Sequence, residues 1–168
     1  MRKIENLSIR ARVAYSILCL ESFLKVESKN LEMFDWLLNE LWKYTFSNLG
    51  SWHEHIAEVT PFSIEEDIDY SKKGCTYINH EKHEDLKLLY SKTDNYIKII
   101  INKIFEIGTK DLYSSISNKS LETKKFVYEI EQILAQNGIE LPICDNLEKY
   151  DIEQNDGWGN EFRKSEII

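Results

Sequence analysis

The chain has 168 residues, of which 30% are charged, and its formal net charge at pH 7 is −8. This length fits one domain with a sizeable hydrophobic core. The acidic balance argues against binding to nucleic-acid phosphates or to an anionic membrane surface, because both need a basic face. A basic protein is a compatible partner.

The low glycine and proline content, six and two residues, is typical of helical domains. The three cysteines, Cys19, Cys75 and Cys144, are an odd and widely spaced set, and no signal peptide is evident at the N-terminus. We therefore expect free thiols in a reducing cytoplasm. No apolar run has the length needed to span a bilayer, so we expect a soluble cytoplasmic protein.

The N-terminal part of the chain predicts a helical hairpin. Apolar residues recur at helical spacing over residues 6–26 and again over 31–46, where Asn30 is placed as the N-cap. The connection between the two segments is only a few residues long. We therefore expect two antiparallel neighbouring helices.

Shorter elements are expected next. Ser51 and Ser63 each begin a capping-box pattern, which predicts helices over residues 51–59 and 63–70. Residues 71–75 then form a loop. Two interpretations of residues 76–79, an irregular segment and a short extended one, stay open.

The segment 93–108 is apolar on nearly every side. Its isoleucines would suit a buried strand equally well, but its length and end signals favour a helix. Thr93 and Asp94 are placed as N-cap, and Gly108 as the left-handed residue that follows the last turn. A helix without a polar face must be covered on most sides. We therefore predict an all-α fold, a single-domain helical bundle around a central apolar helix at about 93–108.

Three further helices are expected around this segment, over residues 81–91, 111–117 and 121–136. Ser120 is placed to cap the last of them, and Asn137 and Gly138 end it. Beyond it the helical periodicity disappears, yet the acidic and aromatic tail over 139–168 is too apolar for a disordered extension. We expect an irregular C-terminal strap that packs on the bundle, within one domain over 1–168.

The four histidines form two pairs, His53 with His55 and His80 with His83. On a helix His80 and His83 would share a face near Glu84, and zinc accepts such ligands. A zinc site needs further ligands at defined spacing, and the sequence has no CxxC, HExxH or repeated Glu-x-x-His pattern. Motifs of nucleophilic catalysis and phosphate binding are also absent. We expect no metal, no cofactor and no catalytic residue; a metal-dependent helical enzyme using His80 and His83 is the alternative.

Two acidic blocks concentrate the negative charge. Residues 54–69 contain six acids and no Lys or Arg, and residues 139–162 contain seven acids and only Lys149. A solvated acidic face is the ordinary explanation. The functional hypothesis is a docking surface for a basic protein, with interleaved aromatic anchors. Trp52 and Phe62, near helix ends, are expected to pack in the core instead. The partner-binding candidates are Glu65, Glu66, Asp67, Asp69, Tyr150, Asp151, Glu153, Asp156 and Trp158.

Four stretches carry a family resemblance: residues 14–21 (AYSILCLE), residues 38–44 (LNELWKY), Glu58-x-x-Pro61 and the terminal Asp156-Gly-Trp-Gly159. Together they resemble the all-helical immunity proteins of bacterial polymorphic-toxin loci, particularly the family usually called Imm six. Trp42 and the 156–159 turn are the positions that we match to the family pattern.

This resemblance implies a non-enzymatic protein that binds a cognate toxin domain and blocks its activity. A basic nuclease is one candidate for that toxin, because an acidic inhibitor can occupy a basic substrate groove. A third hypothesis, beside the immunity protein and the metal-dependent enzyme, is a generic helical adaptor or regulator with another partner.

Overall fold

The computed structural model describes residues 3–27 and 31–168, and the elements of that part are helical, with no strand. The fold is all-α, as predicted. No helix within these described ranges is both long enough and apolar enough to cross a membrane. The α-helices are α1 (Ile9–Glu27), α2 (Asp35–Trp42), α3 (Leu49–Val59), α4 (Pro61–Ile64), α5 (Tyr70–Lys73), α6 (His80–Ser91), α7 (Asn95–Thr109) and α8 (Leu121–Gln136). The 3-10 turns are η1 (Lys3–Asn6), η2 (Leu31–Phe34), η3 (Lys43–Thr45), η4 (Asp145–Leu147), η5 (Asn155–Gly157) and η6 (Lys164–Glu166).

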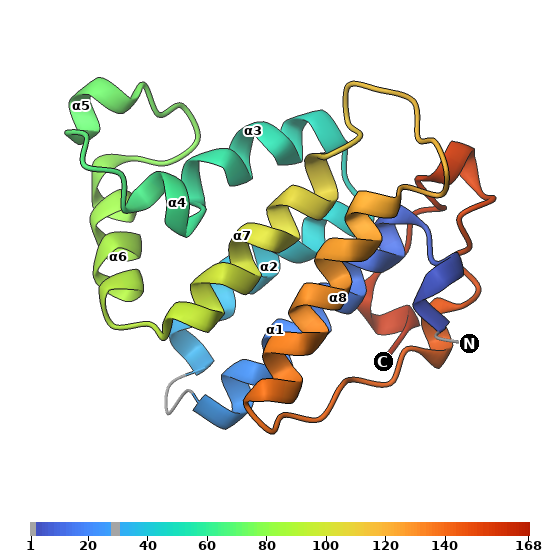
Figure 1. Cartoon of the computed structure of the whole chain (residues 1–168). Coiled ribbons are helices and arrows are strands. Elements are labelled where there is room, and N and C mark those ends of the chain that lie inside the picture. Colours follow the sequence, from blue (N-terminus) through green and yellow to red (C-terminus); the bar gives the residue numbers. More distant parts are fainter. Residues whose placement is uncertain (1–2, 28–30) are drawn as a thin grey trace.

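The helices α1, α7 and α8 pack against one another and build the centre of the core (Figure 1). In α1 every residue from Ile9 to Ile17 is buried. In α7 the buried stripe is Ile97, Ile100, Ile101, Ile104 and Ile107. The opposite face of α7 is exposed or half-buried, and it carries Tyr96, Lys98 and Glu106. The most enclosed helix is therefore α1, and a central position for the segment 93–108 is not confirmed.

The predicted end of α7 was wrong. Gly108 was expected after the helix, but it lies inside it, and α7 continues to Thr109. A Cβ atom at Gly108 would lie 2.9 Å from Tyr44 Cε2 and 3.0 Å from Trp52 Cζ3. The hydroxyl of Tyr44 also donates a hydrogen bond to the Gly108 carbonyl at 2.9 Å. Glycine is thus needed here for the close approach of two aromatic rings rather than for a left-handed turn.

Two arginines are buried near the start of α1. The guanidinium of Arg10 donates to the carbonyl of Tyr44 in η3. The guanidinium of Arg12 donates to the Ser120 carbonyl at 3.0 Å and to Thr123 Oγ1 at 2.7 Å, at the start of α8. Burial lowers the pKa of Arg12 to about 10. Arg12 therefore stays charged at neutral pH, and its hydrogen bonds join α1 to α8.

Several predicted boundaries of the short helices were also wrong. Asn48 rather than Ser51 caps α3, because its side chain accepts a hydrogen bond from the Ser51 N–H at 3.0 Å. Thr60 rather than Ser63 caps α4, which ends after a single turn. The expected helix over 63–70 is therefore not formed. Residues 71–73, which were expected in a loop, belong to α5 instead.

The structure also differs from the prediction between α7 and α8. The expected helix over 111–117 is not formed: residues 111–113 make a turn and residues 114–117 are irregular. Ser120 does precede α8, but its hydroxyl bonds to Asp111 Oδ2 at 2.5 Å and does not cap the helix. Residues 76–79 are irregular rather than extended. The expected N-cap Asn30 lies outside the described residues.

The strap, residues 139–168, packs on the N-terminal part of the bundle (Figure 1). It follows the end of α8, where Gly138 has a φ of +67°. The strap has no α-helix and contains η4, η5 and η6. Its backbone hydrogen bonds to the bundle join Ser8 N to Tyr150 O, Arg10 N to Trp158 O, Ile152 N to Asn6 O and Phe162 N to Thr45 O. Strap residues such as Phe162 belong to the same core cluster as α1.

The strap depends on a close contact at Gly159, and substituting this residue tests it. Gly159 has a φ of +81°, and a Cβ atom there would lie 2.5 Å from the Cβ of buried Ser8 and closer still to its hydroxyl oxygen. We expect Gly159→Ala to lower the free energy of unfolding by about 2–5 kcal/mol, as left-handed strain and overpacking add. Urea unfolding measures the loss.

The matched control is Gly138→Ala. Its φ of +67° imposes the same kind of strain, but a Cβ atom there meets nothing within 4 Å. We expect a loss of about 1–2 kcal/mol for this variant. Equal losses at the two positions would contradict the proposed contact between the strap and Ser8.

Candidate functional site

The first acidic block runs from α3 to the start of α5, and Glu58 within it has a structural role. The Glu58 carboxylate accepts hydrogen bonds from the N–H groups of Thr76 (2.7 Å), Tyr77 (2.8 Å) and Ile78 (3.1 Å). The neighbouring acid Glu54 accepts a hydrogen bond from the Tyr77 hydroxyl. Both carboxylates therefore hold the irregular segment 76–79 against α3, since backbone N–H groups without a helical or strand partner need other acceptors.

Two of the predicted partner-binding acids already interact with other residues of this chain. Asp69 caps α5, and hydrogen bonds from the hydroxyl and the N–H of Ser71 hold its pKa below the usual value. Glu65 Oε1 lies 2.7 Å from Lys98 Nζ of α7, in an ion pair. Both side chains remain at the surface.

Glu66 and Asp67 are the acids of this block that are most available to a partner. Both are exposed, and neither side chain has an ion pair or hydrogen bond with another described residue. They follow Glu65, the residue after the end of α4 at Ile64. Of the predicted candidates in this block, these two therefore present free negative charge.

A groove lies beside Glu66, between α4 and α7. Its volume is about 490 Å³. The groove is lined by Ala57, Thr60, Phe62, Ser63, Glu66, Asn102, Phe105 and Glu106. The lining contains two carboxylates and no lysine or arginine. Two lysines lie nearby: Lys98 pairs with Glu65, and Lys73 donates to the Ser63 carbonyl.

Phe62 is the exposed aromatic residue of this groove. The expectation that it packs in the core was wrong, because its side chain is 79% exposed, whereas Trp52 is buried as expected. The single turn of α4 explains this: Pro61 and Ile64, three residues apart, both face the core, so Phe62 faces outward. The Phe62 N–H donates to Asn102 Oδ1 at 3.2 Å, which fixes α4 against α7.

The opposite wall of the groove is built from α7. The Phe105 ring is partly buried and lies against two rings of α3, with centroid distances of 6.1 Å to Trp52 and 5.7 Å to His53. His53 Nδ1 lies 3.0 Å from the hydroxyl of Tyr113, a residue that is 80% exposed. The exposed aromatic surface thus continues from Phe62 across α7 to the turn after it.

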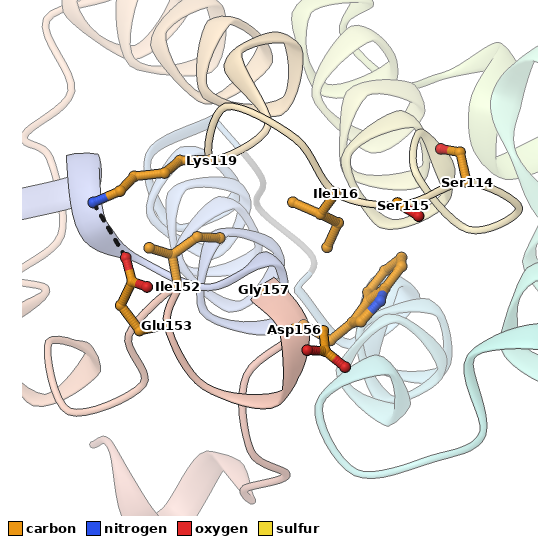
Figure 2. A pocket seen from close by; sticks show the side chains of 9 residues that line it. Ser114, Ser115, Ile116, Lys119, Ile152, Glu153, Asp156 and Gly157 are labelled. Carbon is orange, nitrogen blue, oxygen red and sulfur yellow. Dashed lines mark ion pairs between the residues drawn. The ribbon is translucent and has the colours of Figure 1, made fainter.

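The second acidic block contributes to a separate hollow of about 640 Å³ (Figure 2). It is lined by Ser114, Ser115, Ile116, Lys119, Ile152, Glu153, Asp156, Gly157 and Trp158. The Glu153 carboxylate forms an ion pair with Lys119 Nζ at 3.5 Å (Figure 2). The structure therefore brings together three predicted residues of this block, Glu153, Asp156 and Trp158, at one hollow.

The remaining strap candidates are not free at the surface. Tyr150 is only 7% exposed, and its ring stacks on Phe162 at a centroid distance of 4.0 Å. The strap turns the Tyr150 ring into the core, where it offers little surface to a partner. Asp151 is half-buried, pairs with Leu7 in an isolated bridge and accepts a hydrogen bond from the Glu153 N–H.

The turn 156–159, which carries part of the family resemblance, has constraints that arise from packing. At Gly157, with a φ of +95°, a Cβ atom would lie 3.0 Å from two carbon atoms of Ile116. Gly159 lies against Ser8, and the Trp158 carbonyl accepts the Arg10 N–H at 3.1 Å. These glycines serve the attachment of the strap to the bundle.

The predicted candidates do not form one surface. The first acidic block lies at the α4–α5 end of the molecule, and the strap hollow lies at the opposite end (Figure 1). Sequence reasoning also missed the α7 side of the groove, where Asn102, Phe105 and Glu106 were assigned to a buried helix. Their spacing, together with Lys98, follows one helical face and could have revealed it.

The histidines do not gather into a metal centre. His80 has a 68% exposed side chain and lies 3.7 Å from Glu84, whereas the His83 side chain is buried and lies 3.2 Å from Glu84. The Tyr70 ring contacts both imidazoles, with centroid distances of 5.0 and 5.3 Å. Within the described part of the chain, no three His, Cys, Asp or Glu side chains are grouped so that they could hold a metal ion. Cys19, Cys75 and Cys144 are not joined by disulfide bonds.

Comparison with known protein families, with curated proteins and with solved structures found no match for this chain.

The structural role of Glu58 gives a testable prediction. Glu58→Gln removes the charge and one of the two acceptor oxygens that bind the N–H groups of residues 76–78. We expect a loss of about 1–3 kcal/mol in the free energy of unfolding, because hydrogen bonds to charged groups are the stronger ones. Urea unfolding measures the loss, and amide exchange of residues 76–78 should accelerate.

The matched control is Glu66→Gln, which changes an exposed carboxylate without a partner among the described residues. We expect its effect to stay within about 0.5 kcal/mol. An unchanged stability of Glu58→Gln would show that the carboxylate does not hold this segment.

Proposed function

We propose that this chain is a cytoplasmic immunity protein that neutralises a cognate bacterial toxin domain by stoichiometric binding, without catalysing a reaction. The proposal rests on two exposed acids, Glu66 and Asp67, that have no ion pair or hydrogen bond with another described residue, and on the exposed Phe62 ring, which lines the same groove as Glu66. An aromatic side chain at the centre of a contact, surrounded by a polar rim, is typical of protein interfaces. The family resemblance of the sequence supports the same function.

The charge of this surface favours a basic partner. The block 54–69 carries six acids without a lysine or arginine, and the whole chain has a net charge of −8. Complementary charge accelerates the encounter of two proteins and disfavours wrong partners. A toxin with a basic active-site groove, such as a nuclease, would be bound and blocked by such a surface.

Toxin neutralisation can be tested in cells. The C-terminal domain of a toxin encoded next to this chain should arrest growth when it is expressed alone. We expect co-expression of this chain to restore growth, and the purified proteins to form a 1:1 complex. Continued growth arrest, with no complex detected by calorimetry, would rule out the immunity function. A complex that leaves the toxin active would indicate an adaptor instead.

Charge reversal separates the two acidic blocks. We expect Glu66→Lys with Asp67→Lys to weaken toxin binding about tenfold and to reduce its salt dependence, because exposed interface charges act mainly through long-range attraction. The comparison pair Glu153→Lys with Asp156→Lys changes two exposed acids of the strap hollow at the far end and should change affinity little. Calorimetry at two salt concentrations measures both. A larger loss of affinity with the strap pair would indicate that the interface lies at that end instead.

A further inference from the structure

We propose that the groove between α4 and α7 is the docking site for a partner segment that carries one bulky apolar side chain flanked by lysine or arginine. The inference rests on the proposed function only where it takes the partner to be the toxin domain. The groove has apolar walls, formed by Phe62, Phe105 and Ala57, and two carboxylates, Glu66 and Glu106. Its volume of about 490 Å³ is in the range of pockets that enclose ligand groups.

The exposed Phe62 ring indicates that the groove suits an apolar side chain of a partner. This side chain is 79% exposed, although the α4 residues Pro61 and Ile64 on either side of it are buried. An apolar side chain placed between Phe62 and Phe105 would cover both rings at once. Burying aromatic surface in this way is the usual source of affinity at the centre of an interface.

The carboxylates determine which occupant fits. Glu66 and Glu106 are exposed, and neither side chain has an ion pair with another described residue. A two-fold symmetric dimer through this groove would bring the same carboxylates against each other, and an anionic lipid surface would be repelled in the same way. A segment with lysine or arginine next to its apolar side chain satisfies both features of the groove.

The walls of the groove are held in place before any partner arrives. Thr60 caps α4, and Asn102 binds the Phe62 N–H at 3.2 Å. The Phe105 ring lies against the rings of Trp52 and His53. A preformed groove loses little conformational entropy on binding, which favours affinity.

A synthetic peptide provides a direct probe. It is a blocked hexapeptide with two central leucines and two lysines on each side; one comparison peptide replaces the lysines with glutamates and another replaces the leucines with serines. We expect the lysine–leucine peptide alone to shift the amide resonances of Asn102, Phe105 and Glu106 in a saturable way. No shift at millimolar peptide, equal shifts with the glutamate peptide, or shifts confined to the strap hollow would overturn the proposal.

Three variants test the two features of the groove. Phe62→Ala should weaken binding of the lysine–leucine peptide about tenfold, while the fold is kept because this ring is exposed. Glu66→Lys with Glu106→Lys should reverse the preference, so that the glutamate peptide binds. The matched control is Glu140→Lys, an exposed acid just beyond α8, which should bind like the wild-type chain. An unchanged charge preference in the double variant would overturn the role of the carboxylates.

The same variants keep this proposal separate from the immunity function. If the wild-type chain and Phe62→Ala neutralise the toxin with equal affinity, the groove is not the docking site, although the chain is an immunity protein. If the wild-type chain fails to neutralise the toxin but binds the lysine–leucine peptide in the groove, the immunity function falls and the docking site stands.

Discussion

Two buried guanidinium groups at the start of α1 impose the main constraint on this structure. A charged group that leaves water loses its solvation, and it must recover hydrogen bonds from the protein. Arg10 donates to η3 and to Glu161 of the strap, and Arg12 Nη1 donates to Ser120 and Thr123 at the start of α8. Arg10 Nε and the Nε and Nη2 atoms of Arg12 are buried without a hydrogen-bond partner among the described residues. Segments distant in the sequence must therefore meet around α1.

The buried charges balance in sign, because Glu40 and Glu131 are buried as well as Arg10 and Arg12. With Arg10 and Arg12 buried, much of the remaining positive charge forms surface ion pairs, such as Lys98 with Glu65 and Lys119 with Glu153. Such exposed pairs contribute little to stability, but they neutralise the acids that they contact. Glu66 and Glu106 beside the groove are among the exposed acids that have no ion pair with another described residue.

The sequence was sufficient to predict the helical class and most of the long helices. Apolar residues at helical spacing form one face that packs on the core, so this spacing marks where a long helix lies. The short elements were less predictable, because adjacent polar residues compete for the same capping position. Thr60 caps α4 where Ser63 was expected, and Asn48 caps α3 where Ser51 was expected. Gly108 was misplaced because a glycine required by neighbouring rings looks the same in sequence as one required by a turn.

The candidate site was only partly predictable for a related reason. Charge patterning indicated the acidic block around Glu66, because charge is visible in the sequence. Whether an aromatic residue faces the core depends on how its helix is oriented. Phe62 was therefore assigned to the core, and Tyr150 to the surface, although the structure places them the other way round. The contribution of α7 to the groove became visible only from the three-dimensional arrangement of α4 and α7.

The groove differs from the strap in how freely its residues can change. At Gly157 and Gly159 a side chain would collide with Ile116 or Ser8, so selection for folding restricts these positions. The exposed Phe62 side chain and the carboxylate of Glu66 contribute little to the packed interior. Mutations at these two positions can therefore accumulate at little cost in stability, and a lineage carrying this scaffold could diverge in recognition while its helices stay the same.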